Sequence, residues 1–398
     1  MRVLSISTMF PTKNDPVFGI FVKRRLDALS KIVDLTIVSP VPYFPLLSMM
    51  DRYRTRKNIP KFEKLNKNTD LFFRKFFSIP CILKPLDGFF IFASLFFLIK
   101  KLIKQNGQFD LIDAHLAFPE GFAAIWLGKC FNLPVTITLR GHDVNHLPRY
   151  PIRKRQVIYS LKKASKVFSV ANALRLQAGK LGIDTDKIIV ASNGVRTDIF
   201  YPIDQQQARK KLGIDPKQKT ILSIGYLVAR KGFDLIIDAL KILREKYEID
   251  NVRLIIIGSR GGEAYIKDDL LDRINRSNLQ GYVTFIDQQK NEDLVDWYNC
   301  ADLFCLASSQ EGWPNVILES LACSVPVVAT NVWGIPEIIG HDEKLGIIVE
   351  RSPESIADAI NTSFNTNWDK KYIRHFAESK TWDDTAKLIK QEMQNILR

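Results

Sequence analysis

Two glutamates, Glu311 and Glu319, flank the predicted start of a helix that follows a predicted strand, Leu303–Ala307. Pro314 stands at the expected first position of this helix, where the N–H that proline lacks would have no helical acceptor. The helix is therefore expected to begin at the carboxyl end of the strand. Its positive dipole end and unsatisfied N–H groups predict an anion site there.

The spacing of these groups fits the parts of a nucleoside diphosphate sugar. Glu311 comes just before the helix, and Glu319 lies within it, roughly 7–8 Å along the axis at a rise of 1.5 Å per residue. One carboxylate can accept hydrogen bonds from the sugar hydroxyls, and the other can bind the ribose diol. The backbone N–H groups of Asn315 and Val316 can hold the phosphate between them.

A basic loop is predicted after another strand of the same half. The strand Thr220–Ile224 ends at a glycine, and Arg230 and Lys231 follow before the next predicted helix, Phe233–Lys246. Carboxyl ends of parallel strands meet at one edge of a sheet. We therefore expect Lys231 to face the same site, where its ammonium group would neutralise a leaving diphosphate.

Polar residues also follow predicted strands in the first half of the chain. Gly19 lies in a loop where a glycine lets the backbone approach a ligand closely, and His115 comes just past another strand. Arg140, His142 and Asp143 follow the next strand, and all are expected at a ligand-binding edge. His115 is predicted either as a buried histidine or as a ligand contact, and the three later residues form one substrate-facing group without separate roles.

Short apolar runs alternate with helical-length segments along the whole chain, which is typical of parallel strands covered on both faces. The predicted strands are Val3–Ser7, Leu35–Val38, Phe109–Ile112, Val135–Leu139, Val167–Val170, Ile188–Ala191, Thr220–Ile224, Arg253–Ile257, Val283–Ile286, Leu303–Ala307, Val327–Thr330 and Gly346–Val349. We predict an α/β protein with two doubly wound domains, at residues 1–200 and 201–380. A terminal helix in 381–398 is expected to pack back on the first domain.

Composition narrows the class of protein. The 398 residues are 46% hydrophobic and 25% charged, which excludes disordered, collagen-like and coiled-coil chains. The formal net charge of +14 favours anionic partners. Five cysteines form no CxxC pair, so a zinc site or disulfide framework is not expected and a reducing cytosol fits better. The polar first residues predict no secretory signal.

Basic and aromatic segments gather in the first half. Phe89–Ile99 is strongly apolar but, at 11 residues, much shorter than the roughly 20 that a spanning helix needs. Asp51–Lys75 and Arg149–Lys166 are rich in lysine and arginine. The apolar segment is either a buried core helix or an interfacial helix, and together the three segments favour peripheral contact with an anionic membrane on its cytoplasmic side.

The segment Glu311–Glu319 resembles the E-x7-E signature of family 4 glycosyltransferases, which are retaining enzymes of the GT-B fold. Ile221–Phe233 is similar to the family's G-R-L-x-x-x-K-G stretch, so the resemblance gives Lys231 the role of the diphosphate lysine. Tyr226 stands where the family has an arginine, and Arg230 is its expected substitute. Gly312 falls inside the donor motif.

Thr136–Asn145 resembles the family's T-x-H-G-x-D loop, but Arg140 takes the place of the histidine before the glycine, and Ser324 stands where the family has a glycine after the donor helix. The resemblance implies transfer of a sugar from a nucleotide donor, bound mainly by residues 201–380, to an acceptor hydroxyl. The acceptor, expected mainly on residues 1–200, would be a lipid-linked or cell-surface saccharide. Neither a metal nor another cofactor is implied, and Asp184 and Asp186, although they spell DxD, are predicted to form a turn.

Other functions remain as alternatives. A sugar-nucleotide epimerase or a glucan synthase of the same fold would carry similar motifs. A non-catalytic binder of nucleotides or nucleic acid would use the positive charge, although the basic residues here fall on segments expected to be helical, whereas RNA-binding modules display them on sheets. Nucleic acid is therefore not an expected partner.

Overall fold

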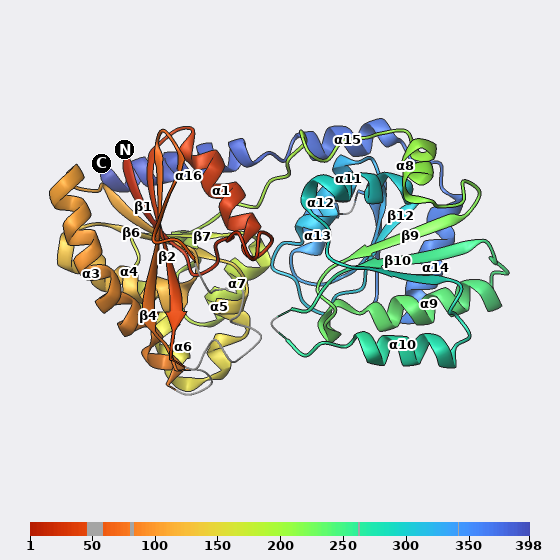
Figure 1. Ribbon diagram of the computed structural model, residues 1–398, viewed down its shortest axis with the longest axis horizontal. Helices are drawn as coiled ribbons and strands as arrows, with labels where there is room; N and C mark the ends of the chain where they lie inside the picture. The colour runs from red at the N-terminus through yellow and green to blue at the C-terminus, as the bar shows by residue number, and fades with distance from the viewer. Residues whose placement is uncertain (46–58, 80–82, 262, 341) are drawn as a thin grey trace. The chain divides into compact units, whose positions relative to one another are not determined.

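The computed structural model describes residues 1–45, 59–79, 83–261, 263–340 and 342–398. The chain divides into two compact units: Met1–Asn193 with Trp382–Arg398, called the first unit, and Gly194–Thr381, called the second unit (Figure 1). This division falls a few residues before the predicted boundary at residue 200. Both units are α/β structures built on Rossmann-like sheets, as predicted.

The second unit contains a parallel sheet with the strand order β11-β10-β9-β12-β13-β14, which is the order of Rossmann folds. Its strands are β9 (Lys219–Ile224), β10 (Val252–Ile257), β11 (Val283–Ile286), β12 (Leu303–Leu306), β13 (Val327–Thr330) and β14 (Gly346–Val349). Each lies within one residue of a predicted strand. The order reverses between β9 and β12, and ligands of open α/β sheets bind at such a switch point.

Alternating side chains of these strands enter two different cores. Leu222 and Ile255 belong to one apolar cluster, whereas Ile221 and Leu254 belong to another, so both faces of the sheet are covered. The helices responsible are α8 (Gln205–Leu212), α11 (Asn291–Cys300), α12 (Asn315–Ala322), α13 (Ile335–Ile339) and α15 (Lys370–Glu378) at the first cluster and α9 (Phe233–Glu245), α10 (Lys267–Arg276) and α14 (Pro353–Asn365) at the second (Figure 1).

The first unit has a mostly parallel sheet with the strand order β3-β4-β2-β1-β5-β6-β7-β8. Its strands are β1 (Arg2–Ile6), β2 (Asp34–Tyr43), β3 (Phe62–Asn66), β4 (Thr69–Phe77), β5 (Leu111–Ala114), β6 (Val135–Leu139), β7 (Lys166–Ser169) and β8 (Ile188–Val190). The order reverses between β1 and β5. Its helices are α1 (Ile20–Ser30), α3 (Asp87–Asn106), α4 (Phe122–Phe131), α5 (His142–Asn145), α6 (Pro151–Lys163), α7 (Asn172–Lys180) and α16 (Trp382–Leu397).

The β3–β4 hairpin corrects one interpretation of the sequence. The part of the basic segment Asp51–Lys75 that the structure describes forms these two strands rather than a helical face, and residues 51–58 lie outside the described residues. Leu71 and Phe73 of β4 are buried, whereas Arg74 and Lys75 are exposed. β3 pairs antiparallel with β4 at the end of the sheet, where charged side chains are common because they discourage further strand pairing.

The apolar segment Phe89–Ile99 lies within α3, whose two sides differ. Ile91, Leu95 and Ile99 are fully buried at helical spacing. On other faces of the helix Phe89 is 44% exposed and Phe97 is 71% exposed. The prediction of a buried core helix is therefore right for one side of α3 only. Across the described residues, no helix combines the length and hydropathy that crossing a bilayer requires.

Helix α16 completes the first unit from the far end of the sequence. Trp382, Ile389 and Met393 are buried in the same apolar cluster as Leu26 and Leu29 of α1. Because α1 is covered by α16, the first unit needs residues from both sides of the second unit in the sequence to bury its core.

Candidate active site

In the second unit, Lys231 and Glu311 meet at the switch point of the sheet. Lys231 follows β9, and Glu311 follows β12. Their Nζ and Oε1 atoms lie 2.5 Å apart, and Ser308 donates its hydroxyl to the same carboxylate oxygen at 2.8 Å. The side chains of Lys231 and Glu311 are each only 10% exposed. The structure thus brings together the two residues that the sequence placed in one donor site.

A glycine explains why the two loops can approach so closely. Gly232, directly after Lys231, has φ 70, and a Cβ atom at this position would lie 2.1 Å from the carbonyl oxygen of Ala307. No side chain fits there, and an L-residue would also be strained at this φ. The N–H of Ser309 donates to the carbonyl of Arg230 at 2.8 Å, which fastens the loops together.

Arg230 adds a second cation at this site. Its Nε lies 2.7 Å from a carboxylate oxygen of Glu263, and its Nη1 lies 3.7 Å from Oε1 of Glu311. Both cationic side chains, Arg230 and Lys231, thus lie near the Glu311 carboxylate.

Charge dominates the ionisation of Glu311. Burial by itself would raise the pKa of this carboxyl, but the charges of Lys231 and Arg230 and the hydrogen bonds from Lys231 and Ser308 outweigh it and lower the pKa below its ordinary value. Glu311 is therefore held in its ionised, carboxylate form.

Helix α12 begins at Asn315, and Pro314 takes the N-cap position rather than the first helical position that the sequence predicted. The difference is one residue and leaves Gly312, Asn315 and Val316 at the amino end of the helix, next to the loop that carries Glu311. Glu319 is 5% exposed and accepts a hydrogen bond from the Tyr298 hydroxyl at 3.1 Å. The Tyr298 contact could not be predicted, because it joins α12 to α11.

In the first unit, Gly19, in the loop after β1, lets two parts of the backbone pack closely together. Gly19 has φ 69 and forms the N-cap of α1. A Cβ atom here would lie 2.6 Å from the carbonyl carbon and oxygen of Met9. The close approach that the sequence predicted toward a ligand is therefore observed toward Met9.

A buried network positions Arg140. His115 is fully buried; its Nδ1 lies 2.8 Å from Nη2 of Arg140, and its Nε2 lies 3.0 Å from the Ser5 hydroxyl and 3.2 Å from Asp113. A neutral imidazole that donates from Nε2 and accepts at Nδ1 satisfies these partners. Arg140 also donates to the side chain of Asn193 at 3.2 Å. Of the two interpretations of His115, the structure supports the buried one.

The three residues predicted as one substrate-facing group have different surroundings. Asp143 is fully buried and accepts hydrogen bonds from the backbone N–H groups of Ala117, Arg140 and Gly141. Burial raises its pKa, against the effect of these bonds. His142 is exposed on α5 and stacks on His146, with ring centroids 4.7 Å apart. Asp143 therefore holds the loop, whereas His142 is exposed and Arg140 is partly buried.

Glu120 is a residue that sequence reasoning missed. It is fully buried, and its carboxylate accepts hydrogen bonds from the N–H of Thr8 at 3.2 Å and from the Thr8 hydroxyl at 3.1 Å. Thr8 follows β1 and Glu120 follows β5, so the pair marks the switch point of this sheet. Burial, partly opposed by these hydrogen bonds, raises the pKa of Glu120 to about 7. An acid in the short run Phe118–Gly121 after a strand was the available signal.

The burial of His115 predicts that the stability of the first unit depends on pH. Burial lowers the pKa of His115 to about 4, Asp113 opposes this, and the charges of Arg140 and Arg25 reinforce it. The unfolded chain binds this proton near the ordinary pKa of 6.5, whereas the folded protein does so only near 4. Stability is therefore lost as the pH falls from about 6.5 toward 4, by roughly 2 kcal/mol at pH 5.

We expect His115→Asn to remove this contribution. Between pH 7 and pH 5 the melting temperature of the wild-type protein should fall further than that of the variant, while His375→Asn, at an exposed position of the second unit, should follow the wild type. Differential scanning calorimetry at the two pH values measures this. Equal losses in the wild type and in His115→Asn would contradict the assignment.

The described residues contain no group of three or more His, Cys, Asp or Glu side chains that could hold a metal ion. Asp184 accepts a hydrogen bond from the N–H of Asp186 at 3.0 Å and so caps a short turn, as predicted for this pair.

Two glycosyltransferase family models match most of the chain between them. Residues 204–380 match the family described as "Glycosyl transferases group 1", and residues 59–199 match "Glycosyltransferase Family 4". The chain is 28% identical over 371 residues to TuaC of Bacillus subtilis (strain 168), a glycosyltransferase assigned to teichuronic acid biosynthesis, covering 90% of this chain and 88% of that protein. It is 27% identical to a D-inositol 3-phosphate glycosyltransferase of Paenarthrobacter aurescens, with 72% of each chain covered.

Solved structures show the same fold at low identity. HepE of Anabaena in complex with UDP superposes with a TM-score of 0.75 at 18% identity, covering 99% of this chain and 100% of that one. Sucrose-phosphate synthase of Thermosynechococcus elongatus has a TM-score of 0.75 at 17% identity, covering 100% and 99%. With adjacent family matches on both units, the chain is a glycosyltransferase that carries the group 1 and family 4 domains, and it has the GT-B fold.

Proposed function

We propose that this glycosyltransferase moves a sugar from a nucleoside diphosphate donor to a hydroxyl group of a cell-surface or lipid-linked saccharide, with retention of the anomeric configuration. In this reaction the bond from the anomeric carbon to the diphosphate breaks, a bond to the acceptor oxygen forms, and the hydroxyl proton is released. The leaving nucleoside diphosphate gains negative charge, so cations at the diphosphate lower the barrier.

The observation that carries the proposal is the cluster of Lys231, Arg230 and Glu311 at the switch point of the second unit. The two cations suit the diphosphate, and the Glu311 carboxylate suits the hydroxyl groups of the sugar. A buried cation interacts with a developing charge more strongly than one in water. No divalent ion is needed for charge neutralisation when two cationic side chains and a helix dipole serve it.

The amino end of α12 completes the proposed donor site. The backbone at Gly312, Asn315 and Val316 would hold a phosphate oxygen, because N–H groups at a helix start attract anions. We assign Glu319 to the ribose hydroxyls, with the Tyr298 hydroxyl, 3.1 Å from its carboxylate, as the positioning contact. In the first unit, Arg140 and His142 are the proposed acceptor contacts, and Gly19 and His115 support them.

Relatives favour this substrate class. The HepE structures contain UDP, UDP with glucose, or UDP-glucose. TuaC is assigned to teichuronic acid biosynthesis, and the relative from Paenarthrobacter aurescens is a D-inositol 3-phosphate glycosyltransferase. The HepE complexes support a sugar nucleotide as donor, and the assignment of TuaC supports a saccharide polymer as acceptor.

A panel of radiolabelled sugar nucleotides, incubated with the protein and membrane lipids of a bacterial host, tests the proposal. We expect label from one donor to enter the lipid or saccharide fraction, with the anomeric configuration of the donor preserved in the product by NMR. An epimerised free donor would indicate an epimerase, and a long homopolymer would indicate a glucan synthase. Inversion at the anomeric carbon would contradict retention.

We further propose that the enzyme contacts the cytoplasmic face of an anionic membrane through α3 and α4. Phe97 and Phe89 of α3 and Trp126 of α4 are 71%, 44% and 38% exposed. Trp126 lies within ring-contact distance of Phe89, at 6.4 Å between centroids, so the two helices present one aromatic surface. Exposed Lys100 and Lys101 continue α3 toward its carboxyl end. Aromatic rings with flanking lysines are typical of interfacial helices on anionic lipid.

Replacing Phe89 and Phe97 with serine tests this surface. Each exposed phenylalanine contributes apolar area that inserts at the headgroup boundary, so we expect the double variant to bind vesicles containing one-third phosphatidylglycerol at least 10-fold more weakly than the wild type. Leu271→Ser is the control, because Leu271 is an exposed apolar residue (40%) on α10 of the second unit. Unchanged sedimentation of the double variant would exclude this surface. Deleting the whole segment Asp51–Lys75 would be less informative, because it would remove β3 and most of β4 from the sheet.

A further inference from the structure

A cavity of about 510 Å³ lies in the second unit, away from the donor site. It is lined by Lys219 at the start of β9, Asp302 just before β12 and Pro326 just before β13. These are the amino ends of the strands, whereas Lys231 and Glu311 follow their carboxyl ends. The cavity therefore lies at the opposite edge of the sheet, and its volume is in the range of small-molecule sites.

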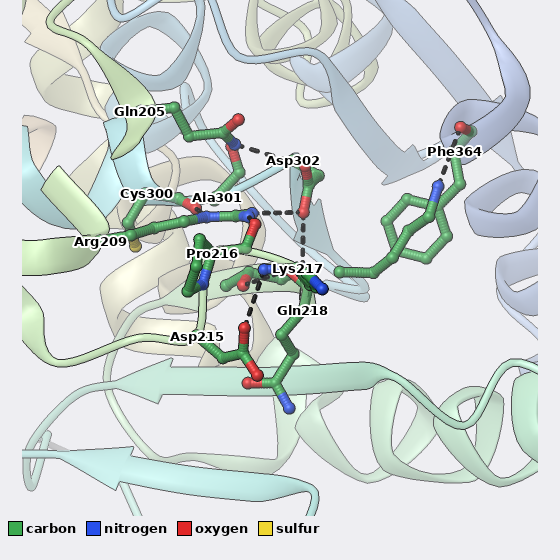
Figure 2. A network of polar contacts seen from close by, with 12 residues as sticks. Gln205, Arg209, Asp215, Pro216, Lys217, Gln218, Cys300, Ala301, Asp302 and Phe364 are labelled. Carbon is green, nitrogen blue, oxygen red and sulfur yellow. Dashed lines mark hydrogen bonds and ion pairs between the residues drawn. The ribbon is translucent and has the colours of Figure 1, made fainter. Parts of the chain in front are cut away.

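The charges along this cavity are positive and incompletely balanced. Lys219, Lys370 and Lys371 line it, and none of these ammonium groups has a carboxylate partner among the residues that the structure describes. Asp302 is the carboxylate in the lining, and it is already engaged. Figure 2 shows Arg209 and Gln205 donating to it, at 2.8 and 3.3 Å, and the N–H of Thr220 donates at 2.6 Å.

Aromatic and hydroxyl groups accompany the charges. Phe364 and Trp368 line the cavity, and the Trp368 indole is fixed by a 3.0 Å hydrogen bond from its N–H to the carbonyl of Ser363. The Ser363 hydroxyl is buried and has no hydrogen-bond partner within the described structure. A buried hydroxyl without a partner is costly, so a ligand that bonds to it is stabilised.

Ser324 adds a second hydroxyl at a strained position. It lines the cavity and has φ 61, the left-handed conformation that glycine adopts without strain. A serine in this conformation costs on the order of 1 kcal/mol of stability relative to glycine. The structure shows that the serine side chain borders this cavity, where glycine would supply no hydroxyl.

We propose that this cavity binds an acidic saccharide, separate from the donor. A sugar presents hydroxyl groups at its edges and C–H groups on its faces, which match Ser324, Ser363 and the two aromatic rings. Its carboxylate or phosphate groups would pair with Lys370, Lys371 and Lys219. Such a site would hold a segment of an acidic chain while the reaction proceeds elsewhere on the protein. The inference rests on the cavity and does not depend on the identity of the donor.

The test is the binding of a tetragalacturonate to the full chain by isothermal titration calorimetry, with maltotetraose as the neutral probe. We expect the acidic probe to bind and the neutral one to bind at least 10-fold more weakly. Lys370→Gln combined with Lys371→Gln should weaken the binding of the acidic probe at least 10-fold. Both lysines are exposed, so their replacement leaves the fold intact. Ser324→Gly, which removes a hydroxyl and relieves strain, should weaken it with no loss of thermal stability.

The control is Arg276→Gln combined with Lys290→Gln, which removes the same charge from exposed positions of the second unit outside this cavity. It should bind the acidic probe as the wild type does. Equal weakening in the control, equal binding of a tetraglutamate peptide, or unchanged binding in the Lys370/Lys371 variant would each overturn the proposal. Lys231→Ala should bind the probe normally, so a failure of the donor assignment and a failure of this site give different results.

Discussion

Replacing Lys231 with alanine is expected to lower the kcat of sugar transfer by at least 100-fold. The Lys231 ammonium is nearly buried and lies 2.5 Å from Glu311, so the charge that faces the leaving diphosphate is held in a low-dielectric position. Removing a preorganised group that stabilises transition-state charge costs about 100- to 1000-fold. Initial rates with a saturating donor measure the effect, because a pure binding loss would raise KM and leave kcat unchanged.

Two further variants test whether the loss of kcat comes from the charge of Lys231 at the donor site. Lys241→Ala changes an exposed lysine of α9, the helix that follows Lys231, and should leave the rate unchanged. Glu311→Gln keeps the size of the side chain and should also lose activity, with a larger effect on sugars that have the full set of hydroxyl groups. If Lys231→Ala retained more than a tenth of the wild-type kcat, the diphosphate role would be wrong.

Gly232→Ala is expected to disrupt both stability and activity. The added Cβ atom would lie 2.1 Å from the Ala307 carbonyl oxygen, so the loop after β9 must move away from the end of β12. We expect a loss of at least about 3 kcal/mol in the stability of the second unit, in the range of overpacked and strained sites. Because Lys231 is the preceding residue, this movement should also separate it from Glu311 and lower kcat.

The chain contains a matched control for backbone strain alone. Gly213 has φ 69, nearly the same as Gly232, and a Cβ atom there would meet nothing within 4 Å. Gly213→Ala should therefore cost only about 1 kcal/mol and leave the rate of transfer unchanged. Chemical denaturation measures the free energy of unfolding of each variant. The difference between the two alanine variants then gives the cost of the contact with Ala307. Equal effects of both variants would show that conformation, and not this contact, sets the requirement for glycine.

The second unit was largely predictable, because its strands are short apolar runs with both faces buried. Leu222 and Ile255 belong to one core and Ile221 and Leu254 to the other, which makes the runs nearly continuous in sequence. The β3–β4 hairpin of the first unit was missed for the opposite reason. It is an edge hairpin whose charged residues hide the alternation of Leu71 and Phe73.

The candidate site likewise contains residues that the sequence could place and contacts that it could not. Lys231 and Glu311 each follow an apolar strand, and the carboxyl edge of a parallel sheet brings such positions together. Other contacts depend on tertiary structure and leave no local pattern in the sequence, such as those of Glu120 with Thr8 and of Glu319 with Tyr298. For the same reason the sequence could not separate the roles of Arg140, His142 and Asp143, whose burial differs although they lie within four residues.

The return of α16 to α1 has a consequence for the order in which the protein forms during translation. Gly194–Thr381 is contiguous, so the second unit can fold as soon as that stretch has left the ribosome. The first unit, although most of it is made earlier, must wait with the apolar side of α1 uncovered until Trp382, Ile389 and Met393 have been synthesised. The half of the protein that is translated first is therefore the half that matures last, and it has the greater need of a chaperone in the interval.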